Sequence, residues 1–391
     1  MMMHCSYKRF LARRASLPLL CAFVFMAFCS VFAGAGFAAA LFTVDRVQVD
    51  VTADNALAAR EEAFDLAQRK AFTQLVDRLS PNGAAAAEID LMDTSVIASM
   101  IKDYEIIEEK ISDVRYIGTY TFRFRSSAVK RFFSGQSLTY SDLESDPIMI
   151  LPFYQVNGRY DLWSYGNRWK DAWDRVNGVK SLVPVIVPVG DLQDVSDMRD
   201  DQAMTYQTYR LRALTDRYGA KETVIAVAVP DSSLIQSIQG GGAAQGSLII
   251  KLYRTDESRP VLATQFFIRA EPNDTHDSLF DRGVQRVQSL LRENWKAQTM
   301  VNAGQMNNIQ ARISIASLQD WVRTEKKLKA VSAVEDVLLE SLTAQRAVVN
   351  LQFEGDLRRL QMALNKQGMK LATLQANDVR VDQTIPMYEL K

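Results

Sequence analysis

Aromatic side chains are concentrated in one short stretch of this 391-residue chain. Two of the tryptophans, Trp169 and Trp173, are four residues apart and share one face of a helix predicted over residues 163–176. If exposed, these aromatics would form a stacking platform for a glycan or an anchor for a protein partner. Packing of this face against a sheet is the favoured interpretation, because amphipathic helices usually cover sheets. The candidate binding residues are Tyr160, Trp163, Tyr165, Trp169 and Trp173.

Histidine and cysteine carry much of the nucleophilic and metal chemistry of proteins, and both are scarce here. All three cysteines lie within the first forty residues, so the remaining body has neither a thiolate nucleophile nor a cysteine metal site. Only His276 lies in that body, and serine–histidine–acid catalysis would have to use it. Its position before an amphipathic helix favours capping over catalysis, and the capping candidates are Asp274, Thr275 and Asp277.

Acidic side chains are dense in the segment 190–201. They are mostly three residues apart: Asp191, Asp194, Asp197, Asp200 and Asp201. Calcium loops place their oxygen ligands at alternate positions around a glycine turn, and this spacing does not match that pattern. We therefore expect a solvated loop or the start of a helix here, and we expect no metal ion or cofactor. Gly240–Gly242 matches neither a phosphate loop nor a dinucleotide fingerprint and is expected to be a flexible loop.

The first forty residues have the three parts of a secretory signal. Four basic residues precede the charge-free apolar stretch Leu17–Ala33, and Ala38–Ala40 supplies small residues for a cleavage site. The charge-free run Ala15–Phe42 is also long enough to span a bilayer, so an uncleaved anchor is the alternative. We expect residues 1–40 to be a cleaved signal peptide and the body to be periplasmic. In the alternative, the body is anchored in the inner membrane and faces the periplasm.

The balanced total of 46 basic and 46 acidic residues hides an uneven distribution. The first forty residues hold four basic side chains and no acidic one, so the body has a net charge of −4. A mildly acidic body argues against a general nucleic-acid binder. With 48% hydrophobic and 24% charged residues, the composition excludes a disordered polymer and a multi-span membrane protein.

Residues 41–145 are predicted to form a β-α-β-β-α domain. An alternating, valine-rich strand precedes a long helix that ends near Leu79, and Thr52–Asn55 offers its N-cap. Two strands follow at about Tyr104–Ile111 and Val114–Arg125. The second alternates aromatic and arginine side chains, as a half-buried antiparallel strand does.

The segment VDRVQVDVTADNALAAREEAFDLAQRKAFTQLVDRLS and the paired strands that end in YTFRFRSSAVKRFFS carry a family resemblance. They resemble the domain-of-unknown-function 2066 family of exported proteobacterial proteins. The matching features are a V-x-V strand, an alanine-spaced helix ending in a Leu-Val-x-Arg-Leu type segment, and an arginine-rich aromatic strand. Ser80 and Pro81 stand where the family usually has a glycine. The resemblance implies an exported protein and assigns no catalytic residue.

Residues 146–304 are predicted to form an α/β domain with some parallel strand pairing, because apolar runs alternate with amphipathic helices. Its predicted elements are the strand IMILPF, helix 163–176, strand 182–189, helix 205–218, strand 222–229, antiparallel strands 246–254 and 261–270, and a helix that begins near His276. The strand IMILPF and this order of elements are similar to the amino-terminal domain of TolB and its periplasmic relatives.

Residues 305–391 are predicted to alternate strand, helix, strand, strand, helix and strand, which is the order of a ferredoxin-like fold. Such folds can bind RNA on their sheet, but the central strands here carry Phe353 without a paired aromatic. Basic residues cluster at Lys326–Lys329 and at Arg358 and Arg359. We expect these clusters to be solvated helix faces.

These observations predict an α+β or α/β protein of three small helix-on-sheet domains that acts in the cell envelope. We expect a non-enzymatic binding or scaffold module whose partner is an envelope protein or a cell-wall glycan, and we expect no nucleic-acid partner. The alternative function is a glycan-acting hydrolase that uses two carboxylates in a cleft.

Overall fold

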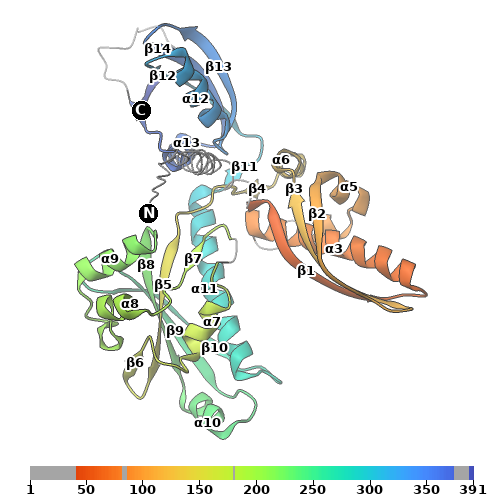
Figure 1. Cartoon of the computed structure of the whole chain (residues 1–391), viewed down its shortest axis with the longest axis vertical. Helices are drawn as coiled ribbons and strands as arrows, with labels where there is room; N and C mark the ends of the chain where they lie inside the picture. The colour runs from red at the N-terminus through yellow and green to blue at the C-terminus, as the bar shows by residue number, and fades with distance from the viewer. Residues whose placement is uncertain (1–40, 82–85, 179–180, 374–386) are drawn as a thin grey trace, which may run out of the picture. The chain divides into compact units, whose positions relative to one another are not determined.

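The computed structural model describes residues 41–81, 86–178, 181–373 and 387–391, and the predicted signal peptide lies outside these ranges. Helices pack against three main sheets, which we name the first, central and last sheets in chain order (Figure 1). This arrangement confirms the predicted mixture of helices and strands in small helix-on-sheet domains. Within the described ranges, no helix has both the length and the apolar character needed to cross a membrane.

The first sheet is antiparallel and has one long helix across one face. Its strands, in spatial order, are β1 (Thr43–Thr52), β3 (Arg115–Phe124) and β2 (Ile101–Ile111). Alternate valines of β1 are buried against α3 (Ala56–Leu79), whose alanines recur every four residues and allow close approach. Asn55 caps α3 by accepting a hydrogen bond from the backbone of Ala58, which confirms the predicted helix start. The shorter helices of this region are α4 (Ala86–Asp90), α5 (Thr94–Met100) and α6 (Ser126–Gly135).

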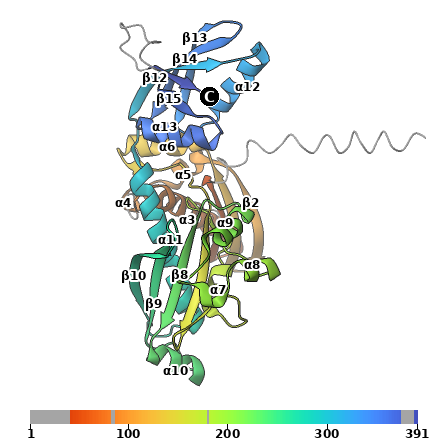
Figure 2. The same cartoon turned by 90° about the vertical axis from the view of Figure 1, so that its left-hand side faces the viewer.

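The central sheet carries helices on both faces. Its strands, in spatial order, are β10 (Val261–Arg269), β9 (Ser247–Arg254), β8 (Glu222–Pro230), β5 (Ile148–Val156) and β6 (Arg159–Asp161), and the short β7 (Val185–Ile186) also pairs with β5. As predicted, β5 and β8 are parallel, and β9 and β10 are antiparallel. One face is covered by α7 (Arg168–Asp174) and α11 (His276–Thr299), and the other by α8 (Leu192–Asp197) and α9 (Thr208–Arg217) (Figure 1). Helix α10 (Ser232–Gly240) lies at one end of this sheet (Figure 1 and Figure 2).

Two elements of the central domain are shorter than predicted. The helix predicted over residues 163–176 begins only after Asn167, whose side chain caps α7. The amide of Asn167 also donates to three backbone carbonyls, and these bonds hold the preceding loop in a non-helical path. The strand predicted over residues 182–189 forms only β7, because Pro184 and Pro188 have no backbone N–H to donate to a neighbouring strand.

The last sheet follows the predicted order of strands and helices and contains one additional strand. Its elements, in chain order, are β12 (Met306–Ser314), α12 (Leu318–Lys329), β13 (Val334–Leu342), β14 (Arg346–Glu354), α13 (Leu357–Lys366), β15 (Leu371–Thr373) and β16 (Met387–Leu390). In space the strands are ordered β13-β14-β12-β16-β15. β16 therefore lies between β12 and β15 and is parallel to β12. The sequence pattern did not predict β16.

Buried polar groups join the last domain to the segment that follows the first domain. In this segment β4 (Thr139–Tyr140) pairs with β11 (Val301–Asn302), just before β12. Arg359 of α13 is only 2% exposed, and its guanidinium donates to the carboxylate of Asp142 and to the backbone carbonyl of Glu354. The Glu354 carboxylate in turn accepts the hydroxyl of Tyr140. Because each buried charge has a partner, the segment is fixed to α13.

Burial of Arg359 corrects the expectation that Arg358 and Arg359 both belong to a solvated helix face. Arg358 is exposed, whereas Arg359 lies on the same side of α13 as Leu360 and Ala363 and is buried with them. Arg359 and Ala363 are four residues apart, which places them on one helix face. This spacing places Arg359 on the buried face, and its charge can be buried there because Asp142 pairs with it.

A second buried cation joins α11 to the end of α3. Lys296 is 2% exposed, and its ammonium donates to the backbone carbonyls of Asp77 and Ser80 at distances of 2.6 and 2.5 Å. These carbonyls lie at the carboxyl end of α3, where the helix offers unpaired acceptors and a negative dipole. Burial, reinforced by the nearby Arg292, lowers the pKa of Lys296 to about 8.

Replacing Arg359 with alanine is expected to lower the free energy of unfolding by about 3 kcal/mol, because Asp142 then loses its buried partner. Urea unfolding at 25 °C measures this loss. Arg358→Ala is the matched control, and it should change the free energy of unfolding by no more than about 0.5 kcal/mol. Equal effects of the two substitutions would contradict the role given to Arg359.

The lowered pKa of Lys296 predicts a stability that rises with pH. Between about pH 8 and pH 10.5 the unfolded chain keeps a proton that the folded chain has released, so the free energy of unfolding increases across this window. We expect the free energy of unfolding of the wild type, minus that of Lys296→Met, to increase by about 1–3 kcal/mol from pH 8 to pH 10. Urea unfolding at several pH values measures it, and a difference that does not change with pH would refute the prediction.

Candidate functional site

The predicted aromatic cluster is divided between the two faces of the central sheet. Successive residues of β5 point to opposite faces, so Ile150 belongs to the core under α7 and α11, while Met149 belongs to the core under α9. Trp169 and Trp173 are fully buried in the first of these cores. The indole of Trp169 donates to the carbonyl of Ala226 at 2.9 Å. Neither tryptophan can therefore contact an external ligand, which confirms the favoured packing of this face and removes both residues from the candidate binding set.

The other three candidate residues lie on the opposite face of the sheet or in the loop before α7. Tyr160 and Trp163 are partly buried in the core under α9, and Tyr160 packs edge-on against Phe153. The indole of Trp163 donates to the carbonyl of Met198 at 2.6 Å. Tyr165 is fully exposed. Tyr160 and Trp163 therefore lie close to the region of α8 and α9, whereas Tyr165 is exposed in the loop before α7.

Exposed apolar side chains gather around α8. Gly190 precedes the helix and lies directly against Trp163, since a Cβ at this position would be 2.8 Å from the indole ring. Val189 is 68% exposed, Leu192 94% and Val195 38%. Arg210 links α9 to the same region by donating to the carbonyl of Ser196 and to the hydroxyl of Tyr209. We name the exposed set the α8 surface, and it consists of Val189, Leu192, Val195 and Tyr209.

A buried carboxylate holds the α8 surface in place. Asp194 is fully buried and accepts hydrogen bonds from the Gly190 backbone, the Tyr218 hydroxyl and the Arg217 guanidinium at 2.7 to 2.9 Å. Burial alone would raise the pKa of Asp194, but the bonds from Tyr218 and Arg217 hold it below its ordinary value. Arg217 also binds Asp197. Because both carboxylates are occupied in this way, they form a structural anchor rather than a free acid–base pair.

The start of α8 confirms one of the two expectations for the acidic segment. Asp191 caps the helix by accepting the backbone N–H groups of Gln193 and Asp194. Asp200 accepts the backbone N–H groups of Leu162 and Trp163 and so ties the loop before α7 to the same region. Among the residues that the structure describes, no three side chains of the metal-binding types come together.

His276 follows the N-cap of α11. The Thr275 hydroxyl accepts the backbone N–H of Ser278, which confirms the predicted capping. The Nε2 atom of His276 lies 3.1 Å from the hydroxyl oxygen of Ser237, a pairing that the sequence did not reveal because the two residues are far apart in the chain. Ser237 donates its own hydroxyl to the carbonyl of Leu234. The serine hydrogen is thus engaged by α10, and the contact joins α10 to α11.

Sequence reasoning found Trp163, which supports the α8 loop at Gly190, but missed Val189, Leu192 and Val195. A signal for the last two was present, because they are three residues apart behind a helix-capping aspartate and so share one face of a short helix. Their exposure could not be read from this pattern, since apolar residues at this spacing are usually buried. Neither a protein-family model nor a curated protein matches the sequence.

The contact between Gly190 and Trp163 predicts a large cost for a side chain at position 190. Gly190→Ala combines a left-handed backbone, with φ at 86°, and a clash with the indole, so we expect a loss of about 2–4 kcal/mol in the free energy of unfolding. The control is Gly219→Ala, where φ is 65° and the space beside the Cα is open. Only the backbone cost of about 1 kcal/mol is expected there. Equal losses in urea unfolding would show that Trp163 does not support the loop.

Proposed function

We propose that this chain is an exported, non-enzymatic envelope protein that acts as a binding or scaffold module and engages a protein partner through the α8 surface. One observation carries the proposal. Leu192 is 94% exposed on a helix that the fully buried Asp194 fixes in position. An exposed leucine alone is ordinary, but a group of exposed apolar side chains on a fixed framework is typical of an interaction site.

The framework supports binding for an energetic reason. Flexible side chains and loops lose entropy when they are ordered at an interface, and this loss weakens association. The bonds of Asp194 to Gly190 and Tyr218 order the α8 loop before any partner arrives. A partner that covers Val189 and Leu192 would remove apolar surface from water, which stabilises the complex, and the α8 loop would lose little further conformational entropy.

A protein fits the α8 surface better than a glycan. Stacking on sugars needs exposed aromatic faces, and two of the tryptophans proposed for that role are buried. The exposed side chains are instead mainly aliphatic. The segment 190–201 holds five aspartates and one arginine, but Asp194 and Asp197 are buried and do not add charge to the surface. Asp194 and Asp197 are paired with Arg217, and Asp201 with Arg199, so we expect a partner that presents mainly apolar side chains.

The proposed location rests on the sequence. The basic, apolar and small-residue parts of residues 1–40 support export, and the resemblance to the domain-of-unknown-function 2066 family agrees with it. The body would be periplasmic after cleavage, or held at the inner membrane if the segment is retained.

The test is a crosslinking pull-down from intact envelopes with wild-type chain and Leu192→Ser. We expect the substitution to reduce recovery of a specific partner at least tenfold, because it places a hydroxyl at the centre of the apolar contact. Leu91→Ser is the matched control, since Leu91 is 90% exposed but belongs to the first domain. Both variants should keep the wild-type urea midpoint. Recovery of one partner at equal levels with all three proteins would contradict the proposal.

A further inference from the structure

One strand at the border of the central sheet has an open edge that is almost free of charge. β10 is the last strand on its side of this sheet and pairs with β9 alone (Figure 2). Residues 261–268 of this strand contain no charged side chain. Leu262 is 48% exposed and Phe267 61%. An exposed and mainly apolar edge strand is a template for pairing with a further strand.

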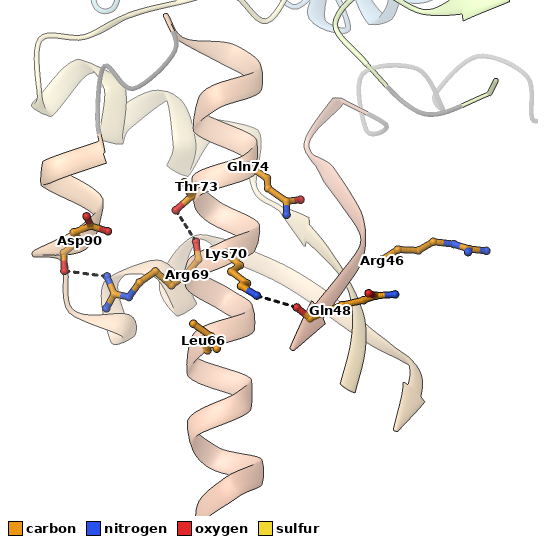
Figure 3. Close-up of a pocket in the computed structure, with 8 residues that line it drawn as sticks. All are labelled: Arg46, Gln48, Leu66, Arg69, Lys70, Thr73, Gln74 and Asp90. Carbon is orange, nitrogen blue, oxygen red and sulfur yellow. Dashed lines mark hydrogen bonds between the residues drawn. The ribbon is translucent and has the colours of Figure 1, made fainter. Parts of the chain in front are cut away.

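Within the described ranges, the other border strands of the three main sheets carry features that discourage such pairing. β6 and β15 have three residues each. Six of the eleven side chains of β2 are charged, and β13 has three acidic residues and two irregularities in its register. The outer edge of β1 is covered from α3. Lys70 donates to the carbonyl of Gln48 (Figure 3), and Arg78 donates to the carbonyl of Thr43. β10 is therefore the exception among these border strands.

The main-chain groups of Gln265 and Phe267 point to the open side of β10. The backbone N–H of Ala270 donates to the residue that precedes β9 and so continues the ladder between the two strands. Because alternate residues turn their main-chain groups to the same side, those of residues 265, 267 and 269 point away from β9. The carbonyl of Arg269 confirms this direction, since it accepts a hydrogen bond from a guanidinium of α11. No described residue bonds the outward groups of Gln265 and Phe267.

The helices leave this border of the sheet uncovered. α11 lies over β9, since a Cβ at Gly283 would be 2.8 Å from the Cδ1 atom of Ile250. On the other face, α9 packs on the core side chains of β5 and β8. Val229, Ile249 and Phe267 lie directly opposite one another across β8, β9 and β10, and we name them the apolar row. Val229 and Ile249 are half-buried, so the row becomes more exposed toward the open edge.

An antiparallel copy of β10 complements this edge. A twofold axis through the strand at Phe267 places this residue opposite itself and Phe266 opposite Ile268. Gln265 is then opposite Arg269, which is the one charged side chain of the strand. Apolar side chains therefore meet apolar ones, an amide meets a guanidinium, and no two like charges are opposed. The outward main-chain groups make the Phe267 pair a hydrogen-bonded one.

We propose that the chain forms a twofold dimer in which β10 pairs with β10 of a second copy and joins two central sheets into one. The apolar row of one chain then continues into that of the other. Such a contact uses both open edges, so association ends at two chains. No residue of β10 belongs to the α8 surface, so the dimer goes beyond the proposed function, and either can fail without the other.

The test is sedimentation velocity of the full chain, which we expect to be a dimer at micromolar concentrations. Phe267→Lys and Phe267→Glu each place two like charges opposite each other, so each should weaken the dimer about tenfold or more. An equal mixture of the two variants should restore the dimer, because lysine then faces glutamate. Tyr165→Lys is the control, since Tyr165 is a fully exposed aromatic residue outside the sheet, and it should associate like the wild type. A monomeric wild type, or association that neither charge at position 267 weakens, would overturn the proposal.

A cysteine at position 267 tests the same contact without a charge. Phe267→Cys leaves one thiol per molecule in a chain whose Cys5, Cys21 and Cys29 are replaced with serine. A hydrogen-bonded antiparallel pair places its Cα atoms about 5.5 Å apart, a distance that a disulfide spans. We expect air oxidation to link two chains about tenfold faster than Tyr165→Cys does in the same background, because pairing raises the local thiol concentration. Equal rates would show that β10 does not meet its copy, and the proposal would be wrong.

Discussion

The pairing of Arg359 with Asp142 is the interaction that fixes the last domain to the segment between the first and central domains. Both side chains are almost inaccessible to water, so each charge needs the other. Asp142 also binds Lys130 of α6, and Glu354 accepts the Tyr140 hydroxyl. The segment between the first and central domains is thereby held by helices from the first and last domains. A hydrophobic contact of similar size would be less directional and would fix this segment less strictly.

A buried carboxylate also fixes the chain at the α8 surface. Segment 190–201 is rich in aspartate and poor in core-forming residues, so apolar packing alone would not order it. The buried Asp194 supplies the missing constraint by binding Gly190, Arg217 and Tyr218. Apolar side chains such as Leu192 are then free to face solvent. In both places a buried carboxylate fixes a segment of chain, and in the second place the fixed segment presents a surface.

Local patterns predicted most of the elements because local physics determines them. The alternating valines of β1, the alanines of α3 and the caps at Asn55 and Thr275 are each read within a few residues. The division of the aromatic cluster was not predictable from local patterns. Trp169 packs on one face of the central sheet and Trp163 on the other, and the sequence does not show which face each residue contacts. Burial of Arg359 likewise depends on Asp142, which lies 217 residues away in the chain. The α8 surface does not follow from a motif, because it is assembled from separate elements.

Native-state hydrogen exchange, followed by mass spectrometry in increasing urea, tests most directly whether the buried contacts of Arg359 and Lys296 join the three sheets into one unit. The relevant amides are those of the middle strands β3, β8 and β12, one from each sheet. The account predicts a common free energy for the largest opening of all three strands, because opening one sheet breaks the polar network that joins it to the others. Three different opening free energies, with the amides of each strand losing protection over a different range of urea concentration, would contradict this prediction.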